Sequence, residues 1–263
     1  MSIERIIPRR NVNDDGKGKK FALHKLITAS SADYVWLTDD DVCVPAVSMD
    51  EAEGWLREHG NPDMVILPLR MTHGDGSLLA KLQQAEYAAI QQLTIETAQN
   101  KRAVMCSGAN LIVKRERWLE SYEDIHPELP SGDDMFLLES FKRRQLTIMV
   151  WDEQRVEASV EPENTLIRLF RQRMRWAGKA NRYTDIDIIR CGFWVAVANA
   201  VQLVCPAIIA VKFPIEYSFI RKRDKNISCW VALLLEIIYP LYMTICLIGG
   251  LSGNTKRHHS TRF

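Results

Sequence analysis

The apolar run Tyr34–Thr38 ends in three consecutive aspartates. A short run rich in β-branched and aromatic residues predicts a buried strand, and ligands of open α/β sheets bind just beyond the carboxyl ends of such strands. Side chains alternate along an extended backbone, so Asp39 and Asp41 are expected on one side and Asp40 on the other. Two like charges on one side are costly unless a cation lies between them, and Mg²⁺ or Mn²⁺ commonly bridges carboxylates to phosphates. The triplet is therefore either a metal site for a phosphorylated substrate or a solvated acidic turn.

The composition narrows the class of protein. A chain of 263 residues, with 47% hydrophobic and 25% charged residues, predicts one folded domain or one domain with an appendage. A formal net charge of +1 gives no case for a nucleic-acid partner. The six cysteines show no close paired spacing, so neither a zinc site nor a disulfide framework is indicated. A reducing, cytosolic compartment follows for the folded domain, and the polar, basic N-terminus has no apolar signal core.

Residues 1–185 alternate short strands with helices, which predicts an α/β domain with a mostly parallel or mixed sheet flanked by helices. Ser48 and Glu51 have the spacing of a capping box that opens a helix ending near His59. Other helices are expected over residues 21–31, 78–99, 135–144 and 164–179, and other strands over 64–69, 103–105, 111–113 and 146–151.

The sequence becomes much more apolar after about residue 186. Residues 191–211 and Cys229–Leu251 are apolar, and each has the ~20 residues needed to cross a bilayer. A buried soluble helix is seldom this long and this apolar on every side, so residues 186–254 are expected to form a membrane region with two helices. Residues 255–263 form a basic tail.

Polar residues interrupt both apolar segments. If both segments span, Glu236 must face a partner helix or a polar cavity, with Gln202 or Asn199 as plausible partners. Basic residues occur both in the linker between the segments and in the tail, and two spans cannot place both in the cytoplasm. The alternative is that one segment lies in the membrane interface.

Two further polar motifs precede the apolar segments. Asp133 and Asp134 follow a glycine and open a helix, where the helix dipole favours acids, although a carboxylate there can also act as a general base. The helix after residue 164 is rich in arginine. It either faces lipid headgroups or clamps a diphosphate, with a tryptophan to stack on a sugar ring. The residues concerned are Arg168, Arg171, Gln172, Arg173, Arg175 and Trp176.

The order of these pieces resembles the family 2 glycosyltransferases of the GT-A fold, especially their membrane-attached, synthase-like branch. The resemblance covers roughly residues 12–251. It rests on Gly16-Lys17-Gly18-Lys19 with Ala22-Leu23, Thr38-Asp39-Asp40-Asp41, Ser107-Gly108-Ala109-Asn110, Gly132-Asp133-Asp134 and Gln172-Arg173-Met174-Arg175-Trp176, followed by two hydrophobic segments.

The resemblance implies a GT-A-like, hexosyltransferase-type enzyme that transfers sugar with inversion from a UDP- or GDP-linked donor to a glycan or lipid-linked hydroxyl acceptor. It implies a divalent cation, Mg²⁺ or Mn²⁺, on Asp39 and Asp41, and Asp134 as the catalytic base beside Asp133, where glutamate is commoner. The donor diphosphate would contact Lys17, Lys19, Asp39, Asp40, Asp41 and Arg175, and the acceptor Gly108, Asn110, Gln172 and Trp176. The expected location is a multi-pass protein of the inner or cytoplasmic membrane, with its catalytic domain in the cytoplasm.

The chain departs from the family at its beginning. Family members open with a strand, a nucleotide-binding loop and a further strand, but only Met1–Asn13 stand here before the Gly/Lys loop, which begins at Asp14. A βαβ unit needs ~30 residues, so the part that recognises the nucleotide base is expected to be missing. Two other classes remain open: a metal-dependent nucleotidyl- or phosphotransferase, in which paired aspartates also bind metal and phosphate, and a non-catalytic membrane scaffold with an α/β domain.

Overall fold

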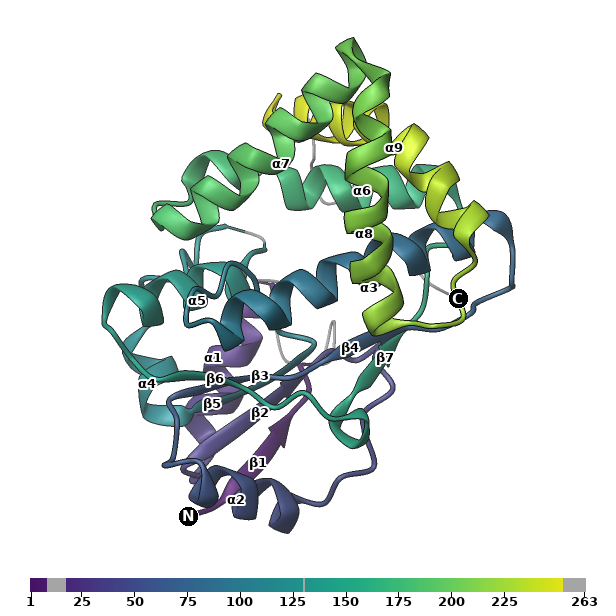
Figure 1. The fold of residues 1–263 in the computed structure, drawn as a ribbon. Helices are drawn as coiled ribbons and strands as arrows, with labels where there is room; N and C mark the ends of the chain where they lie inside the picture. The colour runs from purple at the N-terminus through teal and green to yellow at the C-terminus, as the bar shows by residue number, and fades with distance from the viewer. Residues whose placement is uncertain (9–17, 130, 253–263) are drawn as a thin grey trace.

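A mixed sheet forms the centre of the α/β domain (Figure 1). The computed structural model describes residues 1–8, 18–129 and 131–252. In the sheet, β1 and β2 are parallel, β5 is antiparallel to both β2 and β3, and β3 and β6 are parallel, which confirms the predicted sheet type. In spatial order the strands are β1 (Ile3–Ile6), β2 (Tyr34–Thr38), β5 (Asn110–Lys114), β3 (Met64–Ile66) and β6 (Ile148–Val150).

A second, two-stranded parallel sheet pairs β4 (Leu69–Met71) with β7 (Ala158–Val160). The single strand expected over 64–69 is therefore two strands, because Pro68 lies between them and proline cannot donate to a ladder. Residues 103–105 form no strand; Ala103 and Val104 are nevertheless buried.

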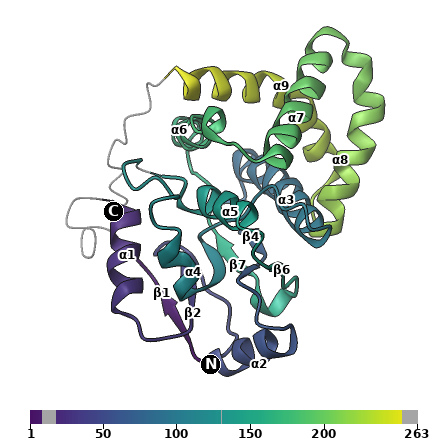
Figure 2. The same cartoon turned by 90° about the vertical axis from the view of Figure 1, so that its left-hand side faces the viewer.

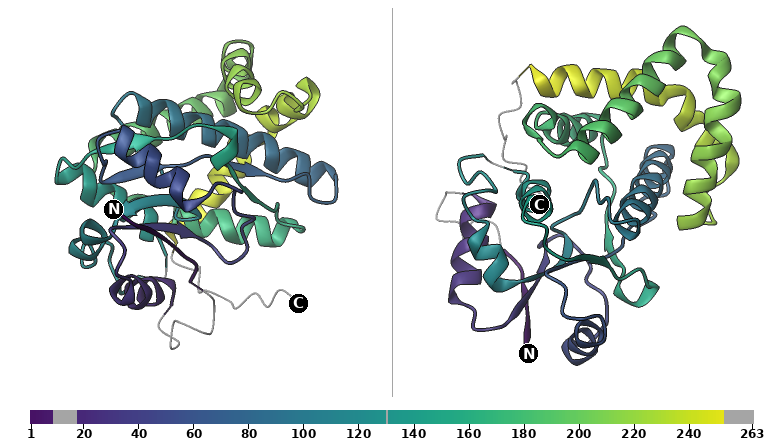
Figure 3. Two further views of the ribbon diagram at one scale, coloured as in Figure 1. Left: turned by 90° about the horizontal axis from the view of Figure 1, so that it is seen from below. Right: turned by 60° about the vertical axis from the view of Figure 1, so that its left-hand side comes forward.

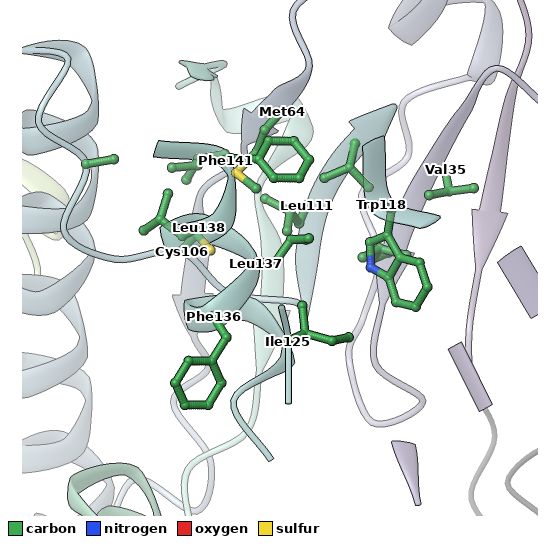
Figure 4. Packing of buried hydrophobic residues seen from close by; sticks show 14 of the residues in the cluster. Val35, Met64, Cys106, Leu111, Trp118, Ile125, Phe136, Leu137, Leu138 and Phe141 are labelled. Atoms are coloured by element: carbon green, nitrogen blue, oxygen red, sulfur yellow. The ribbon is translucent and has the colours of Figure 1, made fainter. Parts of the chain in front are cut away.

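Alternation along β2 divides the core between the two faces of the sheet. Val35 and Leu37 join the cluster under α1 (Lys19–Ala29), α4 (Arg115–Glu120) and α5 (Asp133–Arg143), part of which Figure 4 shows. Tyr34 and Trp36 point to the opposite face.

That opposite face is covered by α2 (Met49–Glu58), which lies apart from the other helices (Figures 1 and 3). The predicted capping box is present at its start, since Ser48 Oγ accepts from Glu51 N at 3.2 Å and Glu51 Oε2 accepts from Ser48 N at 3.1 Å. Trp55 of α2 stacks on Trp151 with ring centroids 4.9 Å apart.

Two long helices connect the sheet to the C-terminal region. The helix α3 (Leu78–Gln99) has the bounds that its apolar spacing predicted, and α6 (Leu166–Ala177) carries the arginine-rich motif. Figure 1 shows both between the sheet and the last three helices, of which the last two pack on α3 and the last one also packs on α6.

The C-terminal region contains α7 (Ile186–Val204), α8 (Ile209–Arg223) and α9 (Cys229–Leu251). The bounds of α9 agree with the second predicted segment, but the prediction of one helix over 191–211 is wrong. The chain leaves α7 at Cys205, makes a short 3₁₀ turn at Pro206–Ile208 and returns as α8. Proline lacks the N–H that would continue α7, and its ring clashes with the carbonyl four residues earlier. By length and mean composition alone, α7 and α9 are candidate membrane spans.

Candidate functional site

Lys19 joins two carboxylates that come from distant parts of the chain. Its Nζ lies 2.7 Å from Asp39 Oδ1, just beyond the end of β2, and 3.1 Å from Asp133 Oδ2, in the first turn of α5. Lys19 is itself the first residue of α1, and the preceding Gly18 has φ 95°, a conformation that favours glycine. The fold thus gathers three predicted motifs at the carboxyl edge of β2, where ligands of open α/β sheets bind.

Gly108 brings the backbone close to the same carboxylates. Its N–H donates to Asp134 Oδ2 at 3.4 Å, and Asp134 Oδ1 accepts from Met135 N at 2.8 Å. A Cβ at position 108 would lie 3.2 Å from Asp133 Oδ2 and 3.4 Å from Lys19 Nζ. A larger residue would therefore press on the ion pair, so the predicted Gly108 is part of the carboxylate cluster.

The charges of this cluster are coupled. Burial lowers the pKa of Lys19, but the carboxylates of Asp133, Asp39 and Asp134 outweigh it and raise the pKa overall. Burial also opposes the charge of Asp133, yet the nearby ammonium of Lys19 holds the pKa of Asp133 below its usual value. Burial raises the pKa of Asp39 by more than the ammonium of Lys19 lowers it. The charges of Asp133 and Asp41 also raise this pKa. Lys19 and Asp133 are accordingly the charged pair on which the cluster is built.

The arginine-rich motif on α6 contains one residue with a role that the sequence did not indicate. Arg173 is 6% exposed, and its Nη2 lies 2.7 Å from Oε2 of the equally buried Glu86 on α3. Its guanidinium also covers the ring of Trp176, 4.2 Å from the centroid. Arg173 therefore faces neither lipid headgroups nor a diphosphate, which corrects that expectation; it fixes α6 to α3.

The rest of the motif remains nearer to the surface. Trp176 is 37% exposed, and Gln172 Nε2 donates to Glu163 Oε1 at 3.1 Å. Arg175 is close enough to Lys179 for its charge to lower the pKa of that lysine.

Lys179 is a site residue that sequence reasoning missed. Burial lowers its pKa, Asp134 raises it, and its Nζ lies 3.3 Å from Ser131 Oγ, directly before the Gly-Asp-Asp motif. It follows Arg175 by four residues, so a cation one helical turn beyond the motif was the available signal. Lys179 links the end of α6 to the carboxylate cluster.

A second missed lysine lies at the start of α1. Lys20 donates to the carbonyls of Ile125 and His126 at 2.5 and 2.8 Å, and burial lowers its pKa to about 8. It holds the chain that leads to α5 in place.

Four other predicted residues have different outcomes. Asn110 is not available to an acceptor, because its amide donates to the buried carbonyls of Pro68 and Val156 and accepts from Trp36 Nε1. Asp40 and Asp41 are exposed beyond β2. Lys17 lies outside the described residues.

The carboxylates fit a divalent cation only as a pair. Within the described part of the chain, no group of three or more histidine, cysteine, aspartate or glutamate side chains is placed to hold a metal ion. Mg²⁺ needs only one or two protein carboxylates when substrate phosphates and water complete its shell. Asp39 and Asp41 would be that pair, since both directly follow β2; Asp41 is exposed, and Asp39 already accepts from Lys19 Nζ at 2.7 Å.

The sequence model of the glycosyltransferase-like family 2 matches residues 1–179. The chain belongs to this family. All the residues of the carboxylate cluster and of α6 lie inside the match, whereas α7, α8 and α9 follow it.

Comparison with solved structures adds little to this assignment. A structure described as the crystal structure of a mycobacterial protein is 19% identical, with a TM-score of 0.33. The match covers 61% of this chain and spans half the length of that one. No curated protein matches the sequence.

Proposed function

We propose that the chain is an inverting glycosyltransferase that moves a sugar from a UDP- or GDP-linked donor to a hydroxyl of a glycan or lipid-linked acceptor at a membrane. One observation carries the proposal beyond family membership. Four motifs that lie far apart in the sequence meet at Lys19, Asp39, Gly108 and the Asp133–Asp134 pair. A phosphotransferase would account for the carboxylates but gives no particular reason for the motif on α6.

Inversion needs one in-line displacement at the anomeric carbon. A base takes the proton of the acceptor hydroxyl as its oxygen bonds to that carbon, and the nucleoside diphosphate leaves. Asp134 is suited to be the base, because it is half-buried and its carboxylate accepts bonds from backbone N–H groups. Asp133 is instead paired with Lys19.

The leaving diphosphate needs positive charge. Lys19 lies within the carboxylate cluster, the charge of Asp134 acts on Lys179, and the charge of Arg175 acts in turn on Lys179, so these three residues would supply it. A divalent cation held by Asp39 and Asp41 would neutralise the charge that develops on the diphosphate. Gln172 and Trp176 would contact the acceptor, for which a partly exposed indole ring offers a stacking surface.

The reaction class can be tested with the purified full chain in lipid vesicles. With UDP- and GDP-sugars whose anomeric linkage is α, we expect release of the nucleoside diphosphate and a β-linked product, because a single displacement inverts the centre. Proton NMR coupling constants of the product give the configuration. An α-linked product would contradict the single-displacement mechanism.

We also propose that α7, α8 and α9 hold the protein on the cytoplasmic face of a membrane. The full chain should remain in the membrane fraction after an alkaline carbonate wash. Lysines at the exposed positions Val204 and Val211 should weaken this retention, since each charge costs about 2.5–3.5 kcal/mol in hydrocarbon. Ser31→Lys, at an exposed position just after α1, is the matched control and should leave retention unchanged. Release of the unmodified chain by carbonate would contradict stable membrane insertion.

A further inference from the structure

The helix α7 is too short in its uncharged part to span a bilayer. Asp187 and Arg190 lie in its first turns, and the stretch from Cys191 to Val204 contains no charge. That stretch is about 14 residues, or ~21 Å at ~1.5 Å per residue, whereas the hydrocarbon core is ~30 Å thick. The turn at Pro206 ends the helix there.

Both ends of the α7–α8 hairpin are tied to the same domain. Asp185, the N-cap of α7, accepts from Lys142 Nζ of α5 at 2.5 Å. At the other end, Arg223 of α8 pairs with Asp152 at 2.6 Å and with Glu157 at 3.1 Å. The chain thus leaves the catalytic domain through α7 and returns to it through α8.

The turn of the hairpin lies at the far end of the molecule from α2 and the N-terminus (Figures 1 and 2). Leu203, Val204 and Val211 are exposed there, Val204 by 87%. Trp194 is 65% exposed and lies ~15 Å down α7 from the last helical residue, which is close to the depth of one leaflet. Tryptophan concentrates at that depth in membrane proteins.

Lys212, the charged residue nearest the turn, faces the interior of the hairpin. Glu216, one helical turn further along α8, pairs with it at 3.0 Å but is 40% exposed. Lys212 Nζ lies 2.7 Å from Oε1 of Glu236 on α9, whose side chain is 1% exposed. The same ammonium donates to Gln202 Oε1 at 3.0 Å and to Asn199 Oδ1 at 3.3 Å. The amides expected to accompany Glu236 are therefore present, joined by a lysine that sequence reasoning left out. Because these groups satisfy one another, the outer surface of the hairpin can enter hydrocarbon without exposing them.

The helix α9, which contains Pro240, packs on helices of the α/β domain near both of its ends. Near its start, Val231 and Ala232 pack on alanines of α3. Near its end, a Cβ on Gly250 would lie 2.5 Å from the carbonyl oxygen of Met174 on α6. Figures 2 and 3 show this end of α9 running across α6. The face turned outward is apolar along its length, through Trp230, Leu233, Ile237, Leu241, Ile245 and Ile248.

We propose that these helices form a monotopic anchor that enters one leaflet of the bilayer from the side of the catalytic domain. The turn of the hairpin lies within the leaflet, both ends of the hairpin remain on the catalytic side, and α9 lies flat at the interface. This rests on the proposed membrane association, but not on the proposed chemistry. It replaces the two spans that hydropathy alone predicts.

Native cysteines make this topology measurable in the full chain. Cys205 lies at the turn of the hairpin, and Cys43 is exposed on the catalytic domain. Variants would keep one exposed cysteine at a time, with the buried Cys106 and Cys246 left in place. Lys225→Cys, combined with Cys205→Val, marks the exposed loop between α8 and α9. A membrane-impermeant maleimide is then applied to sealed vesicles of each orientation, with and without detergent.

We expect Cys43 and the cysteine at position 225 to be labelled from the same side. Cys205 should be labelled from neither side and should react after detergent is added. Labelling of Cys205 from the side opposite Cys43 would show a spanning hairpin, and labelling from the same side would show a hairpin in water; both results overturn the proposal. Carbonate extraction of the same vesicles reports membrane binding separately, and nucleoside diphosphate release reports the chemistry.

Discussion

Asp134→Asn is expected to lower the rate of glycosyl transfer by about 10²- to 10⁴-fold, the usual contribution of a general base. Asparagine keeps an oxygen that accepts from Met135 N, so the first turn of α5 should persist. Loss of the negative charge from the helix N-terminus should cost less than about 1 kcal/mol of unfolding free energy. Steady-state rates with saturating donor, beside a thermal unfolding curve, measure both quantities.

Asp50→Asn is the matched control. Asp50 occupies the second position of α2, as Asp134 does in α5, but it lies at an exposed site on the other face of the sheet. Its replacement should leave the rate unchanged and affect stability to a similar extent. Full activity of Asp134→Asn would leave that residue with a purely structural role at the start of α5.

Loss of either partner of the Arg173–Glu86 pair should be strongly destabilising. Both side chains are buried, and Arg173 Nε and Nη2 both donate to Glu86 Oε2, at 3.2 and 2.7 Å. Arg173→Met leaves an uncompensated carboxylate between α3 and α6, and Glu86→Met leaves an uncompensated guanidinium. Removing one partner of a buried pair costs about 3–5 kcal/mol, which chemical denaturation measures.

The double variant Arg173→Met with Glu86→Met should recover most of that loss, because two apolar side chains of similar length can pack where the ions were. Arg155→Met is the exposed control. Its ion pair with Glu51 is half exposed on both sides, and such pairs contribute at most about 1 kcal/mol. Single variants as stable as this control would show that the pair does not fix α6 to α3.

Local sequence patterns predicted most of the elements that position the site. The bounds of β2, α3 and α9 agree with those expected, because each is a run with one clear periodicity or a continuous apolar composition. The rule that ligands bind at the carboxyl ends of strands indicated Asp39 alone, and only the resemblance to the family implied that Lys19 and Asp133 belong to the same site.

What the sequence could not supply depends on contacts between distant residues. Arg173 meets a glutamate on α3, and nothing near either residue indicates the pairing. Asn110 stands two residues from Gly108, yet alternation along β5 directs its amide into the core, where Trp36 and two carbonyls use it. The mean hydropathy of residues 191–211 likewise gives no sign that the chain reverses its direction at Pro206.

The most direct test of the candidate site is calorimetric titration of the full chain with UDP- and GDP-sugars, with and without Mg²⁺ or Mn²⁺. We expect donor binding, through the diphosphate, that depends on the cation. Asp41→Asn should weaken that binding sharply while the exposed residue leaves the fold intact, whereas Asp134→Asn and Asp50→Asn should retain it. Equal donor affinity in Asp41→Asn and the unmodified chain, with and without cation, would contradict a metal-dependent donor site at the end of β2.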